Sequence, residues 1–243
     1  MRNKLLKSGI LILLGLSLNG LQAQTVKDIE GNVYKTVKIG KLEWMAENLK
    51  TTKYNDGAAI PLVHSNESMA ELTTGAYAIY EHSRIKELNS DAEVFNAYGV
   101  LYNWYAVETG NLCPVDWRVP TDAEWTTLTD YIEGDAGGKL KSTRITPDAH
   151  PRWESPNTDA TDKYGFSALP GGYHLGNGIF TNVGYSGHWW TSTGDDSRIL
   201  LTFAWYRSIT FDSGNVNRYS NNKQFGFSVR CVRDPDKNTA SEG

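Results

Sequence analysis

The sequence has few of the residues that build thiolate or imidazole metal sites. It contains two cysteines and five histidines, and the histidines show neither His-Glu-x-x-His nor another metal-binding spacing. The Gly-x-Ser-x-Gly motif of serine hydrolases is also missing, and residues 184–187 match only part of it. These absences argue against a thiolate metal or redox site and against a serine hydrolase. A glycosidase, which needs two facing carboxylates, stays open because the chain has 28 acidic residues.

Excess positive charge and long apolar segments are lacking as well. The apolar run at residues 9–18 is too short to span a bilayer. It follows three basic residues and precedes Ala23, which is the pattern of a signal peptide covering residues 1–23; an uncleaved anchor helix is the alternative. Residues 1–23 carry three of the 24 basic and none of the 28 acidic residues, so the net charge of the mature chain is −7. We therefore expect export, no membrane span after cleavage and no nucleic-acid partner.

The two cysteines, Cys113 and Cys231, belong to an exported chain with an even cysteine count. In an oxidising compartment this combination favours a disulfide, and two separate buried thiols are the alternative. The mature chain is long enough for one domain with a full core. We expect a single domain at residues 25–234 and a flexible tail at 235–243, because that tail is polar and short of apolar residues.

A helix-start signal follows the first cysteine. Thr121 can cap the helix while Glu124, three positions later, reaches back to the Thr121 amide, which is a capping box. After it, Trp125, Leu128 and Ile132 recur at helical spacing. The pattern predicts a helix from about residue 122 to residue 132.

Alternating apolar residues predict several short strands. They are expected at 33–39 and 42–45, joined as a hairpin, at 74–80, at 203–211 and 216–219, joined as a second hairpin by a turn at 212–215, and at 225–231, where Phe225, Phe227, Val229 and Cys231 share one face. Residues 100–109 fit a strand that runs into a helix, although periodicity does not decide this. Residues 137–187 contain nine glycines and four prolines, which predicts an extended, loop-dominated region suited to binding.

Seven short blocks occur in order along the chain, at residues 31–34, 43–49, 101–104, 113–125, 165–172, 189–193 and 228–234. Together they resemble the Fibrobacter succinogenes major paralogous domain family of exported proteins from Bacteroidota and Fibrobacterota. The family carries no established activity. The resemblance implies an α+β fold of the C-type-lectin-like, formylglycine-generating-enzyme-like type, with small twisted antiparallel sheets, one or two helices and long loops.

The metal sites of formylglycine-generating enzymes and of C-type lectins are not matched by this sequence. Formylglycine-generating enzymes hold copper with a closely spaced cysteine pair, which this chain lacks. C-type lectins hold calcium with Glu-Pro-Asn and Trp-Asn-Asp motifs, whereas residues 154–157 contain an intervening serine and no Trp-Asn-Asp occurs. We expect no cofactor. Calcium is the one ion for which the loops offer candidate ligands, namely Asp159, Asp162, Asp195 and Asp196. The alternative is that these four acids are simply solvated.

Aromatic residues give the strongest binding signal, with eight tryptophans and thirteen tyrosines. Trp189 and Trp190 are adjacent, so on an extended segment they point to opposite faces, and one can enter the core while the other reaches the surface or a groove. Trp205 and Tyr206 repeat this arrangement. Flat rings beside asparagine side chains suit sugar rings, and core packing is the alternative.

These patterns predict an exported, non-catalytic binding or adhesion module for an extracellular glycan or a protein partner. The alternative is a carbohydrate-active enzyme with an unidentified carboxylate pair. The candidate ligand-binding residues, expected on one shared surface, are Tyr173, Asn177, Asn182, Trp189, Trp190, Trp205 and Tyr206.

Overall fold

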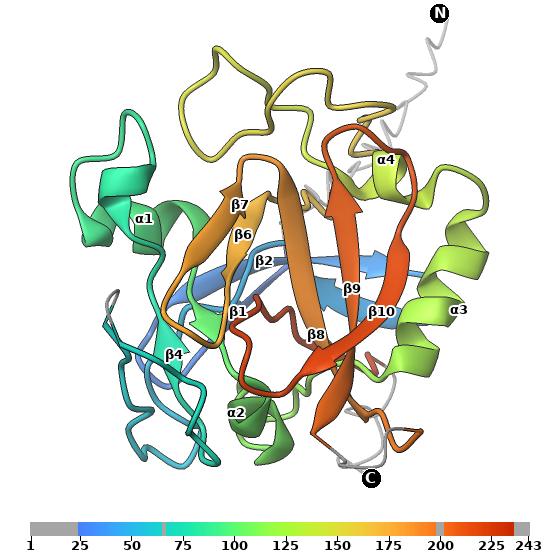
Figure 1. The fold of residues 1–243 in the computed structure, drawn as a ribbon. Helices are drawn as coiled ribbons and strands as arrows, with labels where there is room; N and C mark the ends of the chain where they lie inside the picture. The colour runs from blue at the N-terminus through green and yellow to red at the C-terminus, as the bar shows by residue number, and fades with distance from the viewer. Residues whose placement is uncertain (1–23, 65–66, 198–201, 236–243) are drawn as a thin grey trace, which may run out of the picture.

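The computed structural model describes residues 24–64, 67–197 and 202–235 (Figure 1). The expected signal peptide and all but the first residue of the expected tail lie outside these described residues. The described chain is an α+β architecture built mostly of antiparallel sheets with few helices. None of the helices in this part of the chain is long and apolar enough to cross a membrane.

A four-stranded antiparallel sheet has the strand order β1-β2-β3-β11. Its β2 and β3 strands form the predicted hairpin, and Gly40 takes the left-handed backbone (φ 63°) that the tight turn requires. Alternate β2 side chains are buried, because only one face of the strand meets the core. The strands are β1 (Thr25–Lys27), β2 (Val33–Ile39), β3 (Leu42–Met45) and β11 (Val232–Arg233).

A five-stranded sheet, which lies in front of the first sheet in Figure 1, has the order β10-β9-β8-β6-β7. Neighbouring strands are antiparallel except β6 and β8, which are parallel. The strands are β6 (Gly171–His174), β7 (Phe180–Val183), β8 (Ser186–Gly194), β9 (Phe203–Thr210) and β10 (Asn217–Asn222).

This sheet corrects the expectation of a loop-dominated region at 137–187, which fails from Gly171 onward. The glycines that suggested loops are required inside the strands. Gly172 and Gly187 pair across β6 and β8, and a Cβ atom at Gly187 would lie 2.3 Å from the Trp189 ring. Glycine therefore permits close packing here, and it does not mark a turn.

The remaining elements surround these sheets. Residues 100–109 do form a strand followed by a helix, whereas the strand expected at 74–80 is reduced to two residues. The elements are β4 (Tyr77–Ala78) paired with β5 (Leu101–Tyr102), the 3₁₀ helix η1 (His82–Arg84), and the helices α1 (Asp91–Tyr98), α2 (Trp104–Glu108), α3 (Asp122–Ile132) and α4 (Ala136–Leu140).

The main helix, α3, has the predicted bounds, cap and buried face. The Thr121 hydroxyl accepts from the Glu124 amide at 3.2 Å, and the Thr121 amide donates to the Glu124 carboxylate at 2.8 Å. Trp125, Leu128 and Ile132 are buried in one cluster with residues of both large sheets. The capping box and the helical spacing of the apolar residues are both confirmed.

The C-terminal segment hydrogen-bonds to both large sheets: the Cys231 carbonyl accepts from the Met45 amide of β3, and the Ser228 amide donates to the His188 carbonyl of β8. Phe227, Val229 and Cys231 are buried in one core cluster and Phe225 packs against it, so the predicted shared face is confirmed. The segment is not a continuous strand, however, and pairs through isolated bridges because other elements cover both of its sides. On the opposite side, buried Arg230 donates to the Asn48 side chain at 3.0 Å and to backbone oxygens. Burial lowers the pKa of Arg230 to about 9.

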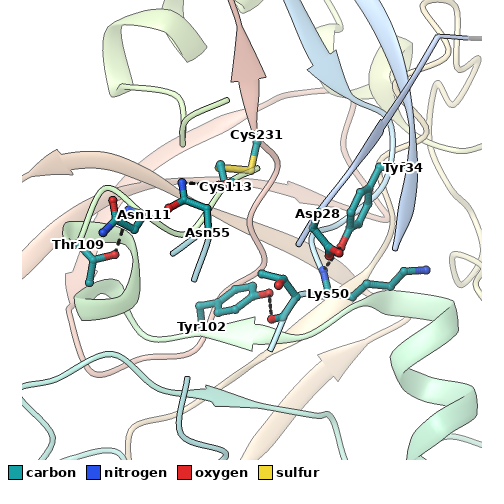
Figure 2. Close-up of a disulfide and its surroundings, with 10 residues drawn as sticks. Asp28, Tyr34, Lys50, Asn55, Tyr102, Thr109, Asn111, Cys113 and Cys231 are labelled. Atoms are coloured by element: carbon teal, nitrogen blue, oxygen red, sulfur yellow. Dashed lines mark hydrogen bonds between the residues drawn. A yellow bond between two sulfur atoms is a disulfide. The ribbon is translucent and has the colours of Figure 1, made fainter. Parts of the chain in front are cut away.

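The predicted disulfide between Cys113 and Cys231 is present (Figure 2). It joins the segment that leads into α3 to the C-terminal segment, across a sequence separation of 118 residues. Asn55 ties a third segment to this bridge. Its side-chain nitrogen donates to the Cys113 carbonyl at 3.1 Å, and its amide donates to the Asn111 carbonyl at 2.8 Å.

Candidate functional site

The register of the five-stranded sheet decides where the predicted binding residues point. Trp190 pairs with Tyr206 and Trp189 pairs with Arg207, so successive side chains alternate between the two faces of the sheet. The candidates consequently divide into two sets and do not form one shared surface. Tyr173, Trp190 and Tyr206 lie on one face, Asn182, Trp189 and Trp205 lie on the other, and Asn177 lies in the turn between β6 and β7.

The adjacent tryptophans correct the expectation that one of them reaches the surface. Trp189 and Trp190 are both 0% exposed. The Trp189 indole donates to the Asn48 side chain at 2.9 Å, and the Trp190 indole donates to the Tyr102 carbonyl at 2.8 Å. They do point to opposite faces, but each face of β8 is covered by its own core cluster. Neither ring offers a surface to a ligand in this structure.

Tyr173 and Tyr206 are half-buried members of a ring cluster around Phe227. Tyr206 lies 4.5 Å and Tyr173 5.9 Å from the Phe227 ring, centroid to centroid, with His188 between the two tyrosines. Burial raises the pKa of Tyr206 to about 12. The Tyr206 ring also lies 6.0 Å from that of Tyr219, which is 52% exposed. The cluster thus reaches solvent mainly through Tyr219.

The two asparagines lie apart from these rings. Asn177 and Asn182 are both exposed, and the Asn177 side chain accepts from the Ile179 amide at 3.3 Å within the turn. Asn182 has a left-handed backbone (φ 65°), which asparagine tolerates better than most residues. Both roles are those of turn and edge residues, so the structure gives each of them a local structural function.

One buried histidine, His174, and one half-buried histidine, His188, make the core acid-sensitive. His174 is fully buried, and within the described residues neither ring nitrogen has a hydrogen-bond partner. Burial lowers the pKa of His174 to about 4 and that of His188 to about 3. In the unfolded chain these rings bind protons below about pH 6.5, whereas in the folded chain they bind protons only near their lowered pKa values. Their contribution to stability is therefore complete above pH 6.5 and is lost as the pH falls towards 4.

Replacing His174 with leucine should remove part of this acid sensitivity. We expect the variant to lose less stability than the wild type between pH 6.5 and 4.5, by up to about 1.4 kcal/mol per pH unit. Urea unfolding at several pH values measures the difference. Parallel stability curves for the two proteins would show that His174 does not cause the sensitivity.

Trp205 borders a surface hollow of about 400 Å³ at the outer edge of the five-stranded sheet. The Arg218 guanidinium stacks on the Trp205 ring, with its central carbon 3.4 Å from the ring centroid. This contact is possible because β9 and β10 pair Trp205 with Ser220, which places Arg218 diagonally opposite on the same face. The hollow is lined by Asp195, Ser197, Trp205, Arg218, Tyr219 and Ser220.

An ion-pair network holds the guanidinium flat on the tryptophan. Asp122, the first residue of α3, accepts from Arg218 Nε at 2.8 Å and from Arg207 Nη2 at 2.7 Å. Arg207 is buried and also donates to the Thr126 hydroxyl at 2.8 Å, which anchors the network to the helix. Within the described part of the chain, the two terminal nitrogens of Arg218 make no hydrogen bond to protein. Arg218 is therefore positioned through Nε and presents its remaining donors outward.

The sequence alone did not identify most of this lining. Trp205 was a predicted site residue and Asp195 a candidate calcium ligand, but Arg218 and Tyr219 were not singled out. The only sequence signal was their place in the second strand of a predicted hairpin. The stacking depends on the diagonal register of β9 and β10, which a predicted turn at 212–215 did not fix to one residue.

Metal binding and nucleophilic catalysis each require particular side chains to lie together. Within the described residues, no group of three or more His, Cys, Asp or Glu side chains could hold a metal ion. Two calcium candidates bond to protein instead: Asp162 accepts from the Ser167 amide and hydroxyl, and Asp195 accepts from Ser197. The hydroxyl of Ser186 lies 2.8 Å from His188 Nε2, but the buried Nδ1 of His188 has no partner in the described chain. A carboxylate that would orient this histidine is therefore missing from the pair.

Comparison with known families gives one finding. The model of the Fibrobacter succinogenes major domain matches residues 37–233, from within β2 to the end of β11. This match confirms the family to which the seven sequence blocks pointed. No curated protein and no solved structure matches the chain.

Proposed function

The chain belongs to the Fibrobacter succinogenes major domain family, and we propose that it is an exported, non-catalytic binding or adhesion module whose ligand is an extracellular glycan. The proposed site is the hollow beside Trp205 and Arg218. The disulfide and the N-terminal sequence pattern support an extracytoplasmic location. A protein partner at the same hollow is the other member of this class, and binding experiments separate the two.

The observation that carries the proposal is the stacked Trp205–Arg218 pair at the border of the hollow, on the face of the sheet opposite the Tyr206 and Tyr219 rings. Sugar rings present C–H groups that pack on aromatic faces, and hydroxyls that accept from guanidinium N–H groups. The hollow borders one indole and one guanidinium group on a paired strand segment, with Ser220 also in its lining. A preformed site of this kind loses little conformational entropy on binding.

The charges near the hollow support binding over glycoside hydrolysis. A glycosidase needs two carboxylates that face the scissile bond. Among the described lining residues, Asp195 is the one carboxylate, and Asp122, behind Arg218, is bound by two arginines. The alternative of a carbohydrate-active enzyme therefore lacks a visible carboxylate pair at this hollow.

The fold proposal accompanies the functional one. We propose that the domain is C-type-lectin-like, of the formylglycine-generating-enzyme-like type. The small sheets, the capped helix α3, the disulfide between its leading segment and the C-terminal segment, and the long loop between α4 and β6 support this. An experimental structure whose topology aligned with neither of those two fold types would contradict it.

Replacing Trp205 or Arg218 with alanine should weaken glycan binding by about 1–3 kcal/mol, which is about 5- to 150-fold in Kd. The loss follows from removing the flat platform in one case and its outward donors in the other. A glycan array identifies the ligand with the wild-type protein, and titration calorimetry then measures the variants.

Two matched variants sharpen this test. Trp205→Phe keeps a flat ring and should retain most of the affinity, and Tyr131→Ala removes an exposed tyrosine (58%) on α3, away from the hollow, and should leave it unchanged. Equal affinity of all four variants and the wild type would reject the hollow as the site. Binding to a protein and to no glycan would assign the module to the second ligand class.

A further inference from the structure

A second hollow lies between the loops that precede β4 and the helix α2, and it shares no lining residue with the first. Its volume is about 480 Å³, within the usual range for small-ligand sites. Two half-buried tyrosines, Tyr54 and Tyr105, contribute their rings, and Glu108 contributes a carboxylate that is half exposed. The remaining lining residues are Pro61, Thr73, Thr74, Gly75 and Thr109.

Three segments that are distant in sequence are fixed around this hollow by buried and part-buried hydrogen bonds. The Asn103 side chain accepts from the Ala76 amide at 2.9 Å and donates to the Thr74 carbonyl at 2.9 Å, which holds that loop against the start of α2. Asn55 ties the loop of Tyr54 to Asn111 and to the disulfide residue Cys113 (Figure 2). The walls are therefore held by the scaffold, although two of them are loops.

Gly75 packs closely against Tyr54 and Ala106 in the wall of this hollow. A Cβ atom at this position would lie 1.9 Å from the Tyr54 hydroxyl oxygen and 2.9 Å from the Ala106 Cα atom. The absence of a side chain at residue 75 lets the Tyr54 hydroxyl approach the backbone and sets the position of its ring. Any larger residue would displace Tyr54 and change the shape of the hollow.

The lining selects a ligand with both an apolar face and hydroxyl groups, and with no net charge. Tyrosine rings offer stacking surfaces, the threonine hydroxyls donate and accept, and the Glu108 carboxylate accepts from a hydroxyl. Lys223 Nζ lies 3.6 Å from Glu108 and over the Trp104 ring at 4.3 Å, so the acid is partly balanced. Among the lining residues that the structure describes, none is a lysine or arginine that could hold an anionic sugar.

We propose that this Tyr54–Tyr105 hollow is a second saccharide-binding site, which takes a single uncharged pyranose residue. This inference rests on the proposed function, because it assumes that the module binds glycans. It adds a separate site, so that one chain binds two saccharide units. Two sites on one module raise the avidity for a branched or polymeric glycan when both engage together.

NMR titration of the ¹⁵N-labelled protein with methyl glycosides of glucose, galactose, mannose and N-acetylglucosamine tests the proposal, with glucuronic acid as the charged comparison. We expect at least one neutral glycoside to shift the amides of Gly75, Tyr105 and Glu108 saturably, and glucuronic acid to bind there at least fivefold more weakly. Tyr105→Ala should weaken this binding at least tenfold. Trp205→Ala and the exposed-tyrosine control Tyr131→Ala should leave it unchanged.

The outcomes separate this inference from the proposed function. If glycans bind at Trp205 and no glycoside shifts the three amides, the second site is refuted and the proposed function stands. If no glycan or glycoside binds anywhere on the wild-type protein, both are refuted. Should Tyr105→Ala unfold, the wild-type shifts and the rim variant Glu108→Gln, for which at least threefold weaker binding is expected, still decide the question.

Discussion

Replacing Trp189 with alanine is expected to lower the free energy of unfolding by about 3–5 kcal/mol. The ring is fully buried, lies 6.2 Å from that of Trp125, and bridges the five-stranded sheet to α3. Its indole donates to Asn48, whose side-chain oxygen also accepts from buried Arg230. Alanine would leave a large cavity and remove one of the two donors to that oxygen.

Urea unfolding followed by circular dichroism measures this loss. Trp205→Ala is the matched control, because the same substitution at a half-buried ring on the neighbouring strand should cost at most half as much. A loss below about 1 kcal/mol for Trp189→Ala would contradict the burial of this ring, because truncations of buried tryptophan cost several times that amount.

Removing the disulfide is expected to have an effect of similar size. In the chain-entropy model, a crosslink that closes a loop of about this length stabilises the folded state by about 5 kcal/mol. The separation of 118 residues makes this one of the larger values the model gives for a single-domain chain. The double variant Cys113→Ala/Cys231→Ala should therefore unfold at a much lower urea concentration than the oxidised protein.

A reductant provides the internal control for this second prediction. It should destabilise the wild type towards the level of the double variant and leave the double variant itself unchanged. If the reduced wild type and the oxidised wild type unfolded at the same midpoint, the bridge would contribute nothing to stability. Peptide mapping without reductant checks that the bond has formed before the measurement.

The sequence predicts α3 and the β2–β3 hairpin correctly, because the residues that determine each of them lie close together in the chain. The capping box of Thr121 and Glu124 and the spacing of the apolar residues define α3, because both depend on residues within one or two helical turns. The β2–β3 hairpin was predictable for the same reason, since its turn and its alternation lie within thirteen residues. The disulfide followed from cysteine count and compartment, with no need for geometry.

The candidate site depended on contacts that the sequence does not encode locally. The two-residue side-chain repeat of a strand predicts that Trp189 and Trp190 point to opposite faces, and they do. The repeat carries no information, however, on what covers each face of β8. The stacking of Arg218 on Trp205 depends on strand register, where a shift of one residue reverses the faces. The Tyr54–Tyr105 hollow joins segments about fifty residues apart, whose meeting only the tertiary structure reveals.

The eight tryptophans make the central claim directly measurable, because indole N–H resonances report on each ring separately. We would titrate the ¹⁵N-labelled protein with the glycan selected by the array. The account predicts a saturable shift of the Trp205 indole resonance, while those of Trp189 and Trp190, buried and bonded to Asn48 and Tyr102, stay in place. A glycan that bound tightly without moving the Trp205 indole would contradict the assignment of the site.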